Sequence, residues 1–236
     1  MLLPQDPARR ELEERQAAPV PKPDVDEAWL TVGGVPVRLV RPPGSARVLP
    51  ALLYLHGGAF VMGNSGTHDR LVRELAVGAG VAVAFVEHDG PFPVALEQAY
   101  GVAQWIRRRG RSAGLDGRRL AVAGDETGGA LAASLAAGRV GFTHQSLYYP
   151  RGIPAQPELG KSPETFIVAR GHGDEGLAYG RRLRTAGVRT STVTFDGAPP
   201  HFMMLNSLRP TAAATAAVDQ AIRALRRACH PERTAP

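Results

Sequence analysis

Residues 120–136 read LAVAGDETGGALAASLA, an apolar run followed by a glycine-rich turn and a run of small apolar residues. Leu120 to Ala123 has the length of a buried strand, and Gly129 to Ala137 has the character of a helix. Glycines on both sides of Glu126 allow the turn between them to tighten. The stretch therefore predicts a strand–turn–helix unit of a parallel sheet, with Glu126 at the tip of the turn.

Strand and helix patterns alternate along the chain around this unit. Trp29–Val32 and Val35–Arg41 flank Gly33 and Gly34, a pattern that predicts a hairpin with a two-residue turn. Further strands are predicted at 52–55, 81–86, 145–149, 165–169 and 190–195, and helices at 71–79, 94–109, 175–186 and 211–228. Such alternation predicts a parallel sheet with crossover helices.

The length and composition predict one large α/β domain. The 236 residues are 44% hydrophobic, which is enough for one substantial core. Residues 1–26, with prolines at 4, 7, 19, 21 and 23, are predicted to form an N-terminal arm with at most a short helix at 8–16, and residues 27–236 the domain. The longest apolar run, 76–86, is about half of a membrane span, and the N-terminus lacks a secretory-signal pattern. We therefore expect a cytoplasmic protein with no membrane partner.

The charge pattern does not favour nucleic-acid binding. Lysine and arginine number 28 against 22 acidic residues, and the arginines are scattered through predicted helices. Cys229 is the single cysteine, and no histidine or carboxylate cluster has the spacing of metal ligands. Neither GxGxxG nor a GK[ST] loop occurs. We therefore expect no metal, no cofactor and no nucleic acid, and a small molecule as substrate or ligand.

Chemistry-bearing residues follow four of the predicted strands, where parallel sheets place their sites. The segments are HGGAF at 56–60, GDETGG at 124–129, RGHGDE at 170–175 and DGAPPH at 196–201. In the first, Gly57 and Gly58 allow backbone N–H groups to point into a cavity as an oxyanion cradle.

Several motifs together resemble a known family. They are YLHGGAFVMGNSGTHDRLVRELA at 54–76, GPFPVALEQAYGVAQWI at 90–106, LAVAGDETGGALAASLA at 120–136, DEGLAYGRRLRTAGV at 174–188 and HFMML at 201–205. Their order is similar to that of the hormone-sensitive-lipase-like branch of the α/β-hydrolases, which includes bacterial carboxylesterases. The resemblance implies a mostly parallel eight-stranded sheet with one antiparallel hairpin strand and flanking helices. It also suggests a homodimer formed through the last strand.

This chain departs from the family pattern at all three positions of the catalytic triad. The family elbow is GDSAGG, and Glu126 stands at the place of its serine nucleophile. His172 falls near the place of the triad acid, and His201 lies one residue beyond the place of the triad histidine. The cradle of Gly57 and Gly58 is intact, and the resemblance adds the backbone N–H of Thr127 as a third donor.

The cap is predicted to be largely missing. Only the short loop at 150–163 stands where the family has a long helical insert. The pocket is therefore expected to be open, or to be closed by the N-terminal arm or a partner subunit.

Three roles are open for Glu126: an acid or base, a nucleophile that forms an alkyl ester, or a ligand contact. We expect an atypical, non-hydrolytic enzyme in which Glu126 acts as acid or base on a small carbonyl metabolite, in isomerisation, elimination or cyclisation, plausibly in specialised metabolism. The alternatives are a catalytically silent binding protein and, third, a carboxylate-dependent hydrolase of esters or epoxides. The candidate catalytic residues are Glu126, His201 and His172, and the candidate binding residues are Gly57, Gly58, Thr127, Ala59 and His88.

The remaining polar residues near these segments are assigned to the scaffold. Asp125 is expected to be a buried hydrogen-bonding group. His68, His144 and His230 are expected at the surface.

Overall fold

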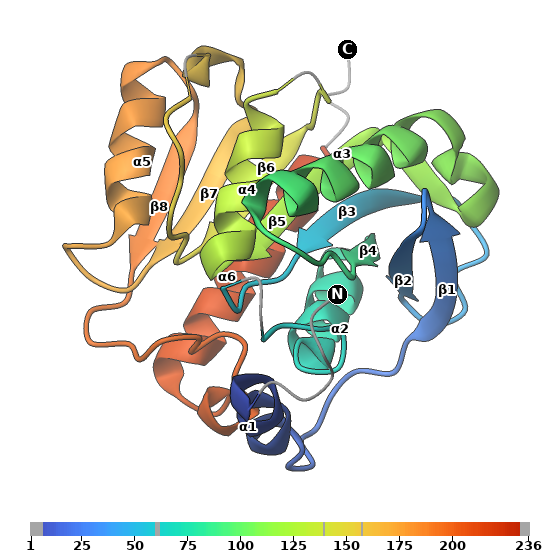
Figure 1. Ribbon diagram of the computed structural model, residues 1–236, viewed down its shortest axis with the longest axis horizontal. Helices are drawn as coiled ribbons and strands as arrows, with labels where there is room; N and C mark the ends of the chain where they lie inside the picture. The colour runs from blue at the N-terminus through green and yellow to red at the C-terminus, as the bar shows by residue number, and fades with distance from the viewer. Residues whose placement is uncertain (1–6, 60–61, 139, 157, 232–236) are drawn as a thin grey trace.

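The computed structural model describes residues 7–59, 62–138, 140–156 and 158–231. The strands of its sheet are β1 (Asp26–Val32), β2 (Val35–Arg41), β3 (Leu49–Leu55), β4 (Ala82–Val86), β5 (Leu115–Asp125), β6 (His144–Tyr148), β7 (Glu164–Ala169) and β8 (Thr190–Thr194). They form one eight-stranded sheet in the order β1-β2-β4-β3-β5-β6-β7-β8 (Figure 1). The β1–β2 and β2–β4 pairs are antiparallel, and the other pairs are parallel. The predicted fold class is confirmed.

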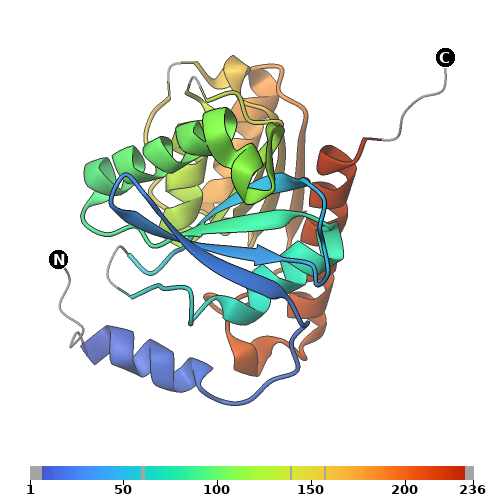
Figure 2. The same cartoon turned by 90° about the vertical axis from the view of Figure 1, so that its right-hand side faces the viewer.

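Helices cover both faces of the sheet. They are α1 (Pro7–Gln16), α2 (Asp69–Ala79), α3 (Phe92–Arg109), α4 (Glu126–Ala136), α5 (Glu175–Thr185) and α6 (Ala212–Cys229), with short 3-10 helices η1 (Gly110–Ala113), η2 (Leu159–Lys161) and η3 (Asn206–Leu208). Buried residues of α3, α4 and α5 form one core cluster against the sheet, and those of α2 and α6 form a second cluster on the opposite face (Figures 1 and 2). Strands β3, β4 and β6 are buried along their whole length because both faces are covered.

Strand β5 is longer than the sequence predicts. It begins at Leu115 and pairs with β3 through an irregular register, in which Pro50 faces Asp116 but the next residue, Ala51, faces Leu120. The extra residues form a bulge that carries the exposed Arg118. A bulge interrupts the apolar pattern of a buried strand, so only its second half is recognisable from sequence.

Glycines bring the backbone of the β5–α4 turn against the end of β3. A Cβ on Gly128 would lie 2.1 Å from the carbonyl oxygen of Leu55, and one on Gly124 would lie 2.3 Å from the carbonyl oxygen of Gly128. No side chain fits in either place. The turn therefore holds Glu126 directly beside the loop that follows β3.

Helix α1 lies apart from the two helical layers, and Figure 2 shows it as a separate rod at one end of the molecule. Gln16, its last residue, anchors it there. Its side-chain amide donates to the carbonyl oxygens of Thr67 (2.5 Å) and Met204 (3.0 Å) and accepts from the backbone N–H of Asn206 (2.8 Å). The arm thus ties the loop before α2 to the loop before α6. Among the described residues, no helix is both long and apolar enough to cross a membrane.

Candidate active site

Glu126 occupies the tip of the strand–turn–helix unit, as the sequence predicts. Its backbone has φ 50°, a left-handed conformation that costs energy for a residue other than glycine. This conformation turns the side chain toward the loop after β3, where one carboxylate oxygen, Oε2, accepts the backbone N–H of Gly58 at 2.8 Å. The carboxylate also lies in the first turn of α4, where the helix dipole favours a negative charge. The Glu126 carboxylate therefore accepts a hydrogen bond from the cradle donor itself.

Asp125, the last residue of β5, holds the loop after β3 in place. Its side chain is 0% exposed, and its Oδ1 accepts from the hydroxyl of Tyr54 and the backbone N–H of Gly57, both at 3.0 Å. Burial alone would raise the pKa of Asp125, but the charge and hydrogen bond of His68 lower it to about 2. The N–H of Gly57 is therefore hydrogen-bonded to Asp125, while the N–H of Gly58 is hydrogen-bonded to Glu126.

His68 is not a surface residue, and that expectation is wrong. It is 1% exposed, and its Nε2 lies 3.2 Å from Oδ1 of Asp125 in a buried pair. Its Nδ1 lies 3.0 Å from the hydroxyl of Thr67, so both ring nitrogens have partners within the protein. His68 thus supports Asp125 and leaves no ring nitrogen for a substrate. His144, which was also expected at the surface, is 1% exposed on β6.

His88 lies beneath the cradle. Its ring stacks on that of His56 with centroids 4.0 Å apart, and its Nε2 lies 3.3 Å from the carbonyl oxygen of His56. Burial lowers the pKa of His56 to about 4 and that of His88 well below the usual histidine value. Two neutral, stacked rings support the loop that presents Gly58.

His201 and His172 have different surroundings. His201, in the loop before η3, has a backbone φ of 57° and lines the same pocket as Gly58. The side chain of His172 is 93% exposed and lies 3.9 Å from the exposed carboxylate of Asp196. Asp174, close in sequence, caps α5 by accepting the N–H of Gly176 at 2.8 Å. Gly58 is thus hydrogen-bonded to Glu126 and lines the same pocket as His201, whereas His172 does not line that pocket.

The remaining predicted residues flank the cradle. Ala59 has a left-handed φ of 52°, which continues the sharp turn after Gly58. Thr127 follows Glu126 in the first turn of α4, and its hydroxyl oxygen is buried with no hydrogen-bond partner among the described residues. No group of three or more potential metal ligands occurs in the described part of the chain.

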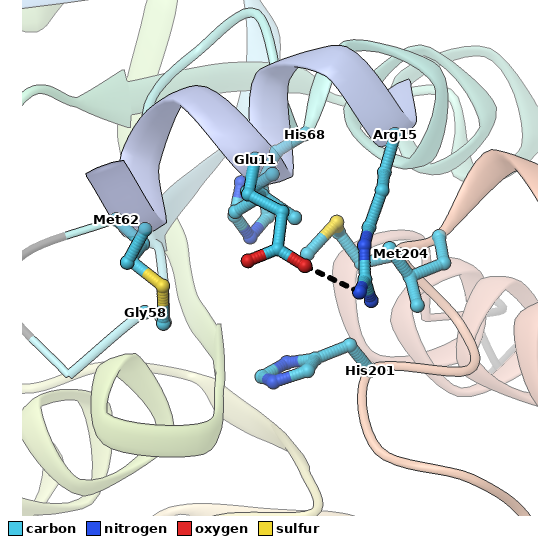
Figure 3. A pocket seen from close by; sticks show the side chains of 11 residues that line it. Glu11, Arg15, Gly58, Met62, His68, His201 and Met204 are labelled. Carbon is cyan, nitrogen blue, oxygen red and sulfur yellow. Dashed lines mark hydrogen bonds and ion pairs between the residues drawn. The ribbon is translucent and has the colours of Figure 1, made fainter. Parts of the chain in front are cut away.

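A cavity of about 170 Å³ lies beside Gly57, Gly58 and His201. It is lined by Ala8, Glu11, Leu12, Arg15, Gly57, Gly58, Met62, His68, His201, Met204 and Leu205. Figure 3 shows Glu11 and Arg15 extending from α1 toward His201, and their side chains form an ion pair at 2.5 Å. Of the two closures that the sequence left open, the described structure shows the arm, which forms one wall of the pocket. Nothing local in residues 7–16 signals this contact, because it depends on Gln16 meeting loops far away in the sequence.

Comparisons with known proteins give relatives that are named as hydrolases. Residues 52–156 match a family described as alpha/beta hydrolase fold. The chain is 36% identical over 149 residues to Esterase LipI of Mycobacterium tuberculosis, covering 58% of this chain and 47% of LipI. It is 30% identical over 272 residues to the ethyl acetate hydrolase of Pseudomonas putida, covering 86% of this chain and 84% of that protein. Among solved structures, a thermostable esterase from Pseudomonas putida ECU1011 superposes with a TM-score of 0.87 at 27% identity, over 95% of this chain and 90% of that one.

These relatives correct the functional expectation from the sequence. An isomerase, lyase or cyclase was expected because a glutamate replaces the serine, yet the similar proteins are named for ester hydrolysis. The same names do not favour the silent binding protein. The expectation is wrong because it depended on the single substituted position Glu126, whereas the similarity to esterases extends over most of the chain. Strand order, cradle and similarity over most of its length together show that this chain belongs to the alpha/beta hydrolase fold family, in its hormone-sensitive-lipase-like branch.

Proposed function

We propose that this protein hydrolyses small carboxylic esters and that Glu126 supplies the base for the reaction. The observation that supports the proposal best is the hydrogen bond of 2.8 Å between Gly58 N–H and the Glu126 carboxylate, beside a pocket that His201 also lines. An oxyanion donor and an imidazole that line one small cavity, with a carboxylate hydrogen-bonded to the donor, are groups that ester hydrolysis uses.

Glu126 is best suited to activate water. Direct attack of its carboxylate on an ester carbonyl would give a mixed anhydride, which is more reactive than the ester from which it forms. A carboxylate that accepts a proton from water avoids this intermediate, because hydroxide becomes the nucleophile. When the ester carbonyl takes the N–H of Gly58, the Glu126 carboxylate is released from that donor and is free to hold the water.

Every proton transfer in this route takes place between water, Glu126, His201 and the substrate. Glu126 accepts a proton from water as the new C–O bond forms, and Gly58 N–H stabilises the negative oxygen of the tetrahedral intermediate. The imidazole of His201 then takes this proton from Glu126 at Nε2, which restores the carboxylate and forms an imidazolium. Collapse of the intermediate breaks the C–O bond to the alkoxide, which takes the proton from Nε2 and leaves the imidazole as it began. The net reaction consumes one water and yields the acid and the alcohol.

The size and lining of the pocket favour short substrates. About 170 Å³ is below the usual range of pockets that enclose drug-sized ligands. Much of the wall is apolar, with Leu12 from α1, Met62 after β3, and Met204 and Leu205 before α6. Acetyl and butyryl esters of small alcohols fit this description.

The test is the turnover of p-nitrophenyl acetate and butyrate by the native protein and by Glu126→Ala, Glu126→Gln and Glu126→Ser. We expect native turnover, with kcat/KM reduced about 10²- to 10⁴-fold in the alanine and glutamine variants, because neither side chain accepts a proton. Glu97→Ala is the matched control, since Glu97 is an exposed carboxylate on α3 outside this pocket. Native-level activity in Glu126→Ala would contradict the proposal. So would an inactive native protein that gains activity only in Glu126→Ser, because the cradle would then be competent without a role for the glutamate.

A further inference from the structure

The buried Tyr149 and the half-buried His201 form a ring contact that the proposed reaction does not yet use. Tyr149 directly follows β6, and its ring meets that of His201 edge to face, with centroids 6.3 Å apart and an interplanar angle of 89°. Tyr149 is 2% exposed. Its hydroxyl and the Nδ1 atom of His201 are both buried, and neither has a hydrogen-bond partner among the described residues. Buried polar atoms are rarely left unpaired, so one on each ring of this pair requires an explanation.

The backbone at both residues is held in an unfavourable conformation. Tyr149 has φ 40° and His201 has φ 57°, values that side-chain-bearing residues rarely adopt. Tyr149 is fixed by its N–H, which donates to the carbonyl oxygen of Val168 at 2.6 Å, and by Phe202, whose ring lies 5.6 Å from its own. Strain that the surroundings maintain on two neighbouring side chains is typical of functional sites.

The aspartates at or just after the ends of β5, β7 and β8 have other contacts. Asp174 accepts the backbone N–H groups of Arg170 and Gly176 as the cap of α5. Asp196 is exposed and lies near His172. The nearby Asp125 accepts from Tyr54, Gly57 and His68. Among the described residues, no carboxylate is therefore hydrogen-bonded to Nδ1 of His201.

We propose that Tyr149 is a positioning residue for His201. The hydroxyl oxygen of Tyr149 accepts the Nδ1–H of the His201 imidazole and so takes the place of the triad acid. The hydrogen bond forms when the His201 ring turns toward Tyr149, and it fixes the tautomer that leaves Nε2 for the leaving alkoxide. The inference rests on the proposed function, because it concerns how His201 exchanges its proton. Burial, together with the negative charges of Asp125 and Glu126, raises the pKa of Tyr149 well above its usual value. The phenol is therefore neutral and orients the imidazole without adding a negative charge.

The test follows the tautomer of His201 by 15N NMR, with His201→Gln to assign its signals. We expect the Nδ1–H tautomer in the native protein and an increased share of the Nε2–H tautomer in Tyr149→Phe. Tyr179→Phe is the matched control, since it removes a hydroxyl that donates to Gln156 at 2.9 Å outside the pocket, and it should leave the His201 signals unchanged. In esterase assays, Tyr149→Phe should lower kcat about tenfold with little change in KM, the effect of one lost hydrogen bond.

The outcomes separate this inference from the proposed function. An Nε2–H tautomer in the native protein, or identical His201 signals in native protein and Tyr149→Phe, overturns the pairing even if ester hydrolysis depends on Glu126. A tautomer shift in a protein that hydrolyses no ester supports the pairing and rejects the proposed function. Folding of Tyr149→Phe is expected to be intact, because the variant removes an unpaired buried hydroxyl and keeps the ring that packs on Phe202.

Discussion

Replacing Asp125 by asparagine should remove a pH-dependent part of the stability of this protein. The pKa of Asp125 is about 2 in the folded chain, against 3.8 for an ordinary aspartate. Each unit of difference corresponds to about 1.4 kcal/mol, so the ionised carboxylate contributes on the order of 2 kcal/mol to the free energy of unfolding at neutral pH. Because the folded pKa is the lower one, this contribution is complete above pH 3.8 and is lost as the pH falls through 2. About 1 kcal/mol of it should disappear between pH 5 and pH 3.

The measurement is urea denaturation of the native protein and Asp125→Asn at pH 5, 4 and 3. At pH 5 the variant should be less stable by about 3 kcal/mol or more, since asparagine leaves the buried ring of His68 without its carboxylate partner. The difference between the two proteins should shrink by about 1 kcal/mol at pH 3. Asp196→Asn is the control, because that carboxylate is exposed, and its difference from the native protein should stay near zero. A difference for Asp125→Asn that is constant from pH 5 to pH 3 would refute the reasoning.

Two further substitutions test how the pocket is built. Gly128→Ala should lower the free energy of unfolding by about 3 kcal/mol or more, because its Cβ would meet the Leu55 carbonyl oxygen at 2.1 Å. Gly101→Ala, with open space around its Cβ on α3, should instead raise it by about 0.5–1 kcal/mol, and equal effects in urea denaturation would contradict this account. Gln16→Ala should detach α1. Limited proteolysis would then show faster cleavage before β1, and ester assays would show a higher KM. Glu14→Ala, an exposed position on the same helix, should change neither, and a Gln16 variant cleaved at the native rate would show that the anchor is not needed.

Local patterns were sufficient to predict the order of elements but not the surroundings of single side chains. The apolar runs and glycine-rich turns predict the alternation of strands and helices because these signals lie within a few residues of each other. His68 shows the limit. It stands among polar residues and looks exposed, yet its partner Asp125 is 57 residues away in the sequence. The Gly-His-Gly context of His172 suggested a site residue, but its loop turns the side chain to solvent.

The position of Glu126 on the cradle determines what this site does when no substrate is bound. In the family pattern a serine hydroxyl would leave Gly58 N–H open, whereas here the carboxylate takes that donor. A neutral ester carbonyl is able to replace it, because the released carboxylate keeps the favourable dipole of α4. A carboxylate product is disfavoured at the same donor, since two like charges in a small, partly apolar cavity repel each other. In the proposed reaction, this one substitution at the elbow would therefore favour entry of the ester and departure of the acid.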